Sequence, residues 1–166
     1  NYKEINNEGY AFCKIRIRNH RKPAVGDKLA SSIAQKASIG MIYNSEDMPY
    51  TKDGIVPDLI MNPHAIPSRM TIAQLMECVL GKVGCIEGNT QDCTPYNDLS
   101  VEDICNKLES YGMEKHSNEI MYDGYTGRQM KTTIFIGPTY YQRLKHVVCD
   151  KIHSRSSNGP IVFLTR

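Results

Sequence analysis

Apolar residues recur with the spacing of an amphipathic helix between positions 71 and 83. The stripe consists of Ile72, Leu75, Met76, Val79, Leu80 and Val83. Thr71 and Gln74 have the spacing of a capping box, and Met70 stands where it would pack against Leu75 as a hydrophobic staple. The pattern therefore predicts a helix that begins near Thr71.

Two further stretches carry helical signals, near 100–111 and near 139–150. In the first, Ser100 is placed as the N-cap of an apolar stripe that ends at Gly112. In the second, Thr139 and Gln142 repeat the capping-box spacing. The apolar residues that follow are Leu144, Val147, Val148 and Ile152. About three helices are expected in all.

Period-two alternation marks the strands. In 13–18, alternate apolar residues are predicted to point inward and Lys14, Arg16 and Arg18 outward, as a solvated face more readily than as a nucleic-acid contact. Gly124 and Gly127 punctuate a predicted hairpin. Other strand candidates are 39–43, 55–60, 120–122, 132–136 and 161–164. The chain is thus predicted to be an α+β unit with a β-rich core.

Composition limits the classes of protein only loosely. The chain has 166 residues, 40% of them apolar, which is enough for one modest core. A formal net charge of +2 neither requires nor excludes a nucleic-acid partner. None of the six cysteines forms a Cys-x-x-Cys pair, so zinc-ribbon and thioredoxin-like sites are not indicated and reduced, structural thiols are expected.

The chain shows no run of apolar residues long enough for a membrane span, and Asn1 opens neither a signal peptide nor a sequence with an initiator methionine. We therefore expect a piece of a longer polypeptide that has no membrane partner.

Three cations stand in positions that favour phosphate binding. Lys28 and Lys36 lie in a loop of small residues, and Arg69 precedes the helix predicted from Thr71, where the helix dipole also favours anions. The Walker A spacing is absent. Taken alone, each lysine is better explained as a surface cation, whereas Arg69 fits a role in satisfying local carbonyls and a role in binding phosphate equally well.

The segment 145–155 contains four more candidates: His146, Lys151, His153 and Arg155. A lone histidine is more often a hydrogen-bonded structural residue. His146 and Lys151 are five positions apart and would not stack on a straight helix. If they act together, the helix must end or bend near Asp150.

No metal site is predicted, because no Asp-x-Asp-x-Asp arrangement of the kind needed for two-metal phosphoryl transfer occurs in the chain. No recognisable spacing of nucleophile, base and orienting group occurs either, which disfavours a small enzyme that acts alone.

Four segments, 22–36, 62–71, 137–146 and 150–155, follow one another in an order that resembles the second-largest subunit of multisubunit DNA-dependent RNA polymerases. The resemblance runs from about residue 15 to residue 166. It implies that 1–166 is part of the hybrid-binding region. It also implies that the chain contributes to a double-psi β-barrel whose other parts come from sequence before Asn1.

The resemblance also implies roles for residues. Lys28 and Lys36 match active-centre lysines that approach the RNA end and the phosphates of the incoming nucleotide, and Arg69 matches an arginine on the triphosphate. His146, Lys151, His153 and Arg155 match residues along the RNA–DNA hybrid.

In that family Mg²⁺ is held by the largest subunit. The implied partners are therefore the largest and other polymerase subunits, template DNA, the hybrid and nucleoside triphosphates. The implied activity is a nucleotidyltransferase, with the isolated chain inactive.

One loop departs from the family pattern, Gly-Asp-Lys-Phe-(Ala/Ser)-Ser-Arg-His-Gly-Gln-Lys-Gly. Here Ser32 and Ile33 replace Arg-His, and Ala34 and Ala37 replace the two glycines, which removes easy access to positive φ. A non-catalytic nucleic-acid-binding or assembly module is the alternative function. The Asn-, Ile-, Lys- and Tyr-rich composition hints at a large DNA virus, so the nucleus, or the cytoplasm and virion, is the expected location.

Overall fold

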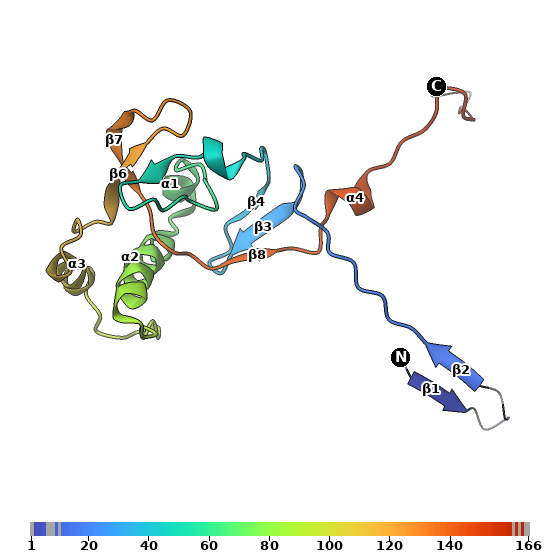
Figure 1. The fold of residues 1–166 in the computed structure, drawn as a ribbon, viewed down its shortest axis with the longest axis horizontal. Helices are drawn as coiled ribbons and strands as arrows, with labels where there is room; N and C mark the ends of the chain where they lie inside the picture. The colour runs from blue at the N-terminus through green and yellow to red at the C-terminus, as the bar shows by residue number, and fades with distance from the viewer. Residues whose placement is uncertain (1, 6–8, 10, 161, 163, 165–166) are drawn as a thin grey trace.

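The computed structural model describes residues 2–5, 9, 11–160, 162 and 164, and combines short antiparallel sheets with helices (Figure 1). The helices are α1 (Ala65–Arg69), α2 (Ile72–Glu87), α3 (Val101–Ser110), α4 (Val148–Lys151) and the 3-10 helix η1 (Ser45–Asp47). The strands are β1 (Tyr2–Ile5), β2 (Ala11–Lys14), β3 (Lys28–Ser31), β4 (Lys36–Ser38), β5 (Tyr50–Thr51), β6 (Asn118–Tyr122), β7 (Gln129–Phe135) and β8 (Tyr141–Arg143).

The strands form two three-stranded antiparallel sheets, in the orders β4-β3-β8 and β5-β6-β7, and a separate β1-β2 hairpin. The hairpin lies away from the other elements at the end of an extended segment, and the chain after α4 extends in a different direction (Figure 1). The predicted mixture of helices and sheets is confirmed.

The main apolar core lies between α2 and α3. Val83 and Leu108 are completely buried, and Ile104 is 2% exposed. The Lys82–Glu119 ion pair, whose side chains are mostly buried, links α2 to β6. The predicted helix from Thr71 is confirmed as α2, and its apolar stripe supplies three residues of this core.

The expected start of α2 is wrong in detail. Thr71 is the N-cap but makes no side-chain capping bond, and Met70 is 78% exposed, so it does not close a buried staple. Gln74 is buried instead, where its amide donates to Met61 Sδ and Tyr141 Oη, both at 3.4 Å. Thr71 Oγ1 accepts a hydrogen bond from Gln35 Nε2 at 2.6 Å, so both side chains that the capping box needed are bonded to distant residues.

Helix α3 and the β6–β7 hairpin agree with prediction. Ser100 Oγ accepts a hydrogen bond from Glu102 N at 3.2 Å, and Gly112 after the helix has φ +77°. Between β6 and β7, Gly127 has φ +66°, and an alanine-like Cβ at Gly124 would meet Met48 O at 2.5 Å. Glycine is therefore required at both turn positions.

The predicted helix over 139–150 is wrong. Residues 141–143 form strand β8, which pairs with β3 through Leu29–Arg143 and Ser31–Tyr141, and only Val148–Lys151 is helical. Thr139 and Gln142 have the spacing of a capping box, but no helix begins there. Pairing with a strand more than a hundred residues earlier decided the conformation.

Three predicted strands are also wrong. In 13–18 only the end of β2 is a strand, and Ile15 and Ile17 are 66% and 86% exposed, because no element among the described residues covers them. The stretches 39–43 and 55–60 lie outside the strands. The candidate at 161–164 includes residues outside the described part of the chain.

Candidate phosphate-binding site

Lys28 and Lys36 lie on one face of the β3–β4 hairpin. Lys28 pairs with Ser38, and Ala30 pairs with Lys36. Directly opposed residues share a face, and so do residues two apart on one strand, so the two lysines form a diagonal pair. Such pairs have Cα atoms roughly 7–8 Å apart, within reach of one phosphate group for long side chains. Both lysines are exposed.

A buried carboxylate fixes the start of β3. Asp27 is completely buried. Its Oδ1 accepts from Val148 N at 2.9 Å, and its Oδ2 accepts from Ala24 N at 3.1 Å and from Arg143 Nη2 at 2.6 Å. These bonds, that from Val148 foremost, hold the pKa of Asp27 below its ordinary value. Asp27 thereby ties β3 to β8 and to the start of α4.

The same linkage brings His146 and Lys151 to Lys28. Lys28 N donates to His146 O at 3.4 Å, and Leu144 N donates to Lys28 O at 2.9 Å. The charge of Lys151 lowers the pKa of His146, with smaller contributions from burial and Lys28. His146 lies before α4 and Lys151 is its last residue, so the two do not share one longer helix, which meets the geometric condition set by their spacing.

His153 and Arg155 lie beyond this corner. Both are exposed in the irregular segment after α4, which extends away from the sheets (Figure 1). No hydrogen bond or ion pair connects their side chains to Lys28, Lys36 or Arg69 within the described part of the chain. The structure therefore brings together two of the four residues predicted to follow the hybrid.

Arg69 reaches the hairpin from a different element. It is the last residue of α1 and is exposed, and its Nη1 donates to Gln35 Oε1 at 3.1 Å. Helix α2 begins three residues later, as predicted. The three proposed phosphate ligands thus come from β3, β4 and the α1–α2 junction.

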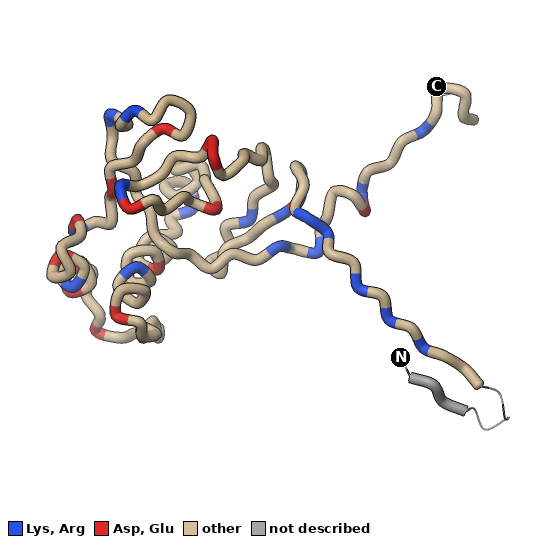
Figure 2. Tube along the Cα trace, in the orientation of Figure 1, with Lys and Arg blue, Asp and Glu red and all other residues tan. Residues whose placement is uncertain are grey.

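Positive charge is concentrated at this end of the molecule (Figure 2). Lysine and arginine residues recur along the extended segment before β3 and along β8 and α4, whereas most acidic residues lie around α2, α3 and the β5-β6-β7 sheet. Between residues 9 and 26 there is no Asp or Glu. This asymmetry favours approach of a polyanion from the side of the β4-β3-β8 sheet.

Sequence reasoning missed Asp27, Gln35 and Arg143, each of which holds a candidate ligand in place. Asp27 and Gln35 each stand directly before one of the two lysines in the sequence. This adjacency was the one sequence feature that could have marked them as residues that position the lysines. Arg143 had no local signal, because its role depends on pairing with β3.

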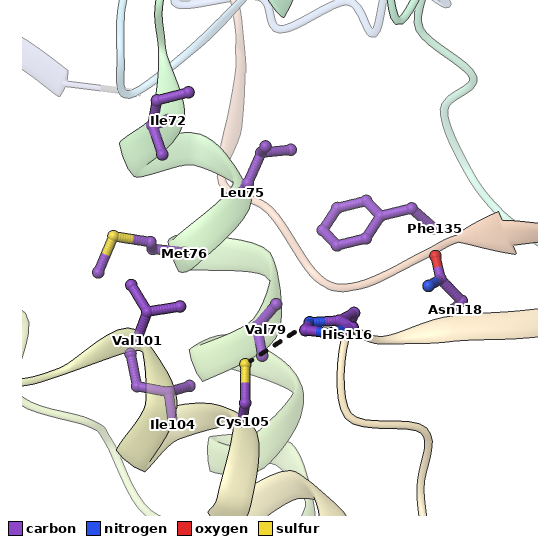
Figure 3. Close-up of a pocket in the computed structure, with 10 residues that line it drawn as sticks. All are labelled: Ile72, Leu75, Met76, Val79, Val101, Ile104, Cys105, His116, Asn118 and Phe135. Atoms are coloured by element: carbon purple, nitrogen blue, oxygen red, sulfur yellow. Dashed lines mark hydrogen bonds between the residues drawn. The ribbon is translucent and has the colours of Figure 1, made fainter.

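An open apolar pocket of about 290 Å³ lies elsewhere, between α2, α3 and the β6–β7 hairpin. Figure 3 shows Leu75, Ile104 and Phe135 lining it, with Cys105 Sγ 3.9 Å from His116 Nδ1. No lysine or arginine lines this pocket, so it does not suit a phosphate.

The family model for RNA polymerase Rpb2, domain 6, matches residues 2–166. The chain belongs to this family. It is 53% identical over 161 residues to the DNA-directed RNA polymerase II subunit RPB2 of Encephalitozoon cuniculi, covering 97% of this chain and 14% of that protein. It is 48% identical to DNA-directed RNA polymerase subunit 2 of Acanthamoeba polyphaga mimivirus, and the match covers 98% of this chain and 14% of that protein. It is 47% identical to DNA-directed RNA polymerase subunit Rpo2 of Saccharolobus shibatae, and the match covers 96% of this chain and 14% of that protein.

Membership in the Rpb2 domain 6 family confirms the resemblance drawn from the motifs. The chain spans about 14% of the length of these relatives. A viral relative stands beside fungal, plant and archaeal ones, so a viral source remains a prediction.

The altered family loop has a structural cost at one of its two former glycine positions. Ala34 adopts φ +61°, a left-handed conformation that glycine reaches without strain. Ala37 lies in β4 without a positive φ. Ser31 Oγ accepts from both Ile33 N and Gln35 N at 3.3 Å and supports the strained turn.

Proposed function

We propose that this chain supplies phosphate-binding cations to the active centre of a DNA-directed RNA polymerase. Lys28, Lys36 and Arg69 would hold the phosphates while the RNA 3′ hydroxyl attacks the α-phosphate of a nucleoside triphosphate and pyrophosphate leaves. The observation that carries the proposal is the placement of both lysines on one face of the β3–β4 hairpin, with Arg69 hydrogen-bonded to the same hairpin through Gln35.

The chemistry explains why fixed cations matter. Phosphoryl transfer concentrates negative charge on the transferring group, and cations already in position stabilise it without reorganisation. Lys28 follows the buried Asp27, and Lys36 follows the buried Gln35, so the backbone at each lysine is held by bonds to distant elements. The lysine side chains remain exposed and free to meet a ligand.

The second part of the proposal concerns the RNA–DNA hybrid. His146 and Lys151 would contact its backbone beside Lys28, and His153 and Arg155 would extend the contact along the segment after α4. Because the pKa of His146 lies below its ordinary value of 6.5, its imidazole is mainly neutral at pH 7 and would act as a hydrogen-bonding group while Lys151 supplies charge.

The residues that the structure describes do not fit a Mg²⁺ site. No group of three or more His, Cys, Asp or Glu side chains that could hold a metal ion occurs among the described residues. Asp27, the carboxylate next to Lys28, already accepts from two backbone amides and Arg143. As the family resemblance implies, the magnesium ions of a complete polymerase would be held by its largest subunit, and the isolated chain should not extend RNA.

The proposed partners follow from this division: the largest and other polymerase subunits, template DNA, the hybrid and nucleoside triphosphates. Exposed apolar side chains such as Ile17 and Met41 suit burial against other polymerase segments, including the rest of a double-psi β-barrel. No helix in the described ranges has the length and apolar character to cross a bilayer. The proposed location is wherever the polymerase works: the nucleus, or cytoplasm and virion for a viral source.

The strained Ala34 favours a second candidate, a non-catalytic nucleic-acid-binding or assembly module that kept the fold. Such a module would tolerate a loop with altered residues at 32–34 and 37. An intact carboxylate triad in the partner subunit favours the enzyme, and a degenerate one favours the module.

The test is Lys36→Ala in a reconstituted polymerase that carries this segment in its second-largest subunit. Loss of one preorganised charge-stabilising group should slow nucleotide addition about a hundredfold or more. Lys107→Ala, at an exposed lysine on α3, is the matched control. Equal rates for both variants in fully assembled complexes would return Lys36 to the role of a surface cation and leave the module as the better reading.

A further inference from the structure

Gln35 is a buried amide at the turn between β3 and β4, 4% exposed, and all of its side-chain bonds lead to the α1–α2 junction. Its Nε2 donates to Ala65 O at 3.2 Å and to Thr71 Oγ1 at 2.6 Å. Its Oε1 accepts from Arg69 Nη1 at 3.1 Å. Because the nitrogen has an obligate acceptor in the Ala65 carbonyl, the amide can present only its oxygen to Arg69.

The backbone of Gln35 is fixed independently of these contacts. Gln35 N donates to Ser31 Oγ, and Ser31 N donates to Gln35 O, both at 3.3 Å. The turn is closed by Ala34 in its left-handed conformation, and Lys36 N donates to Ala34 O at 3.1 Å. One short segment thus sets both the Lys36 backbone and the Gln35 amide.

We propose that Gln35 is a positioning residue that aims the Arg69 guanidinium at the triphosphate, an inference that rests on the proposed role of Arg69. Arg69 is exposed and has a long, flexible side chain whose free ends would otherwise sample many directions. A guanidinium is planar with five N–H donors in a fixed fork, so holding Nη1 restricts its plane and leaves donors for a ligand.

A neutral acceptor is well suited to this task. An amide oxygen restrains Arg69 without cancelling its charge, whereas a carboxylate at the same place would form an ion pair that competes with phosphate. The amide also holds Arg69 from outside its own helix, because the contact crosses from the β3–β4 turn to α1.

The test uses the reconstituted polymerase and measures KM and kcat for addition of a single nucleotide. Gln35→Met keeps the side-chain volume and removes the hydrogen bonds, and KM should rise about tenfold, the size expected for one bond to a charged group, with a smaller change in kcat. Gln35→Glu keeps the contact but pairs Arg69 with a charge, and should raise KM at least as much. Gln129→Met, at an exposed glutamine on β7, should leave both parameters unchanged.

A double-mutant cycle separates positioning from general damage to the fold. In an Arg69→Ala background, Gln35→Met should raise KM no further, because it acts through Arg69. Full additivity of the two effects, or an unchanged KM in Gln35→Met or in an assembled Gln35→Glu enzyme, would overturn the proposal. If Arg69→Ala itself leaves KM unchanged, the proposed role of Arg69 fails, which is a separate result.

Discussion

The α2–α3 core and the β4-β3-β8 sheet are held together in opposite ways. In the first, the most buried residues are apolar: Val83, Ile104 and Leu108. In the second they are polar or charged, with Asp27 fully buried and Gln35 4% exposed. Of the candidate phosphate ligands, Lys28 and Lys36 lie in the β4-β3-β8 sheet, and Arg69 contacts it through Gln35.

The difference has a physical reason. Apolar burial is non-directional, so it stabilises a fold without fixing the direction of any one group. Hydrogen bonds and ion pairs work only in defined geometries, so a polar network fixes the backbone beside each cation. Most of the stability and the positioning of the cations therefore depend on separate regions of this chain. Four changes test that separation.

The largest effect on stability should come from Leu108→Ala. Leu108 is completely buried against α2, so truncation should lower the free energy of unfolding by roughly 2–5 kcal/mol. Leu75→Ala is the matched control, because Leu75 is only partly buried and lines the open pocket. Urea unfolding of the purified chain measures both. Equal losses would show that α2–α3 burial is not the main source of stability.

Asp27→Asn should destabilise the sheet in a pH-dependent way. The folded chain lowers the pKa of Asp27, chiefly through the Val148 amide. Its stabilising contribution is therefore complete above the ordinary pKa of 3.8 and is lost as the pH falls through the lower folded value. The urea midpoint of the variant should lie below wild type at about pH 6, and the gap should narrow near pH 3 and below.

Asp53→Asn, at an exposed turn residue, controls for the general effect of losing a carboxylate. A gap between Asp27→Asn and wild type that does not change with pH would contradict the assignment of Asp27 as a charged anchor.

Ala34→Gly should stabilise the chain by about 1 kcal/mol, because it removes the cost of a left-handed alanine. Ala37→Gly restores the other family glycine, but in a strand without positive φ, and should be destabilising. Thermal unfolding of the two variants shows whether each change raises or lowers the stability of the chain. The same sign for both would mean that the conformation of Ala34 does not control the stability of this loop.

The smallest effect concerns His146, whose pKa should rise when Lys151 is changed to alanine, because the neighbouring charge is the main cause of its lowering. A titration of the imidazole by NMR measures the change. Lys107→Ala, on α3, should leave the His146 pKa unchanged. An unaltered pKa in Lys151→Ala would show that the two side chains do not meet beside Lys28.

Local signals in the sequence sufficed for α2, for α3 with its Ser100 cap, and for the β6–β7 hairpin with its glycine turn. Each of these features depends on residues within about one or two turns of the chain, where periodicity and capping rules operate. Lys28, Lys36 and Arg69 became candidates through the family resemblance of their motifs, because local signals alone favoured surface cations for the two lysines.

Tertiary structure decided the rest. The capping spacing at Thr139 gave way to β8, because residues 141–143 pair with β3, and the Thr71 hydroxyl serves Gln35 instead of its own helix. The Asp27–Arg143 pair joins residues 116 positions apart, which no local pattern encodes. The sequence by itself determined α2, α3 and the β6–β7 turn, whose signals are local. Only the folded chain decided which cations share a face, because burying a charge or an amide requires partners that distant segments supply.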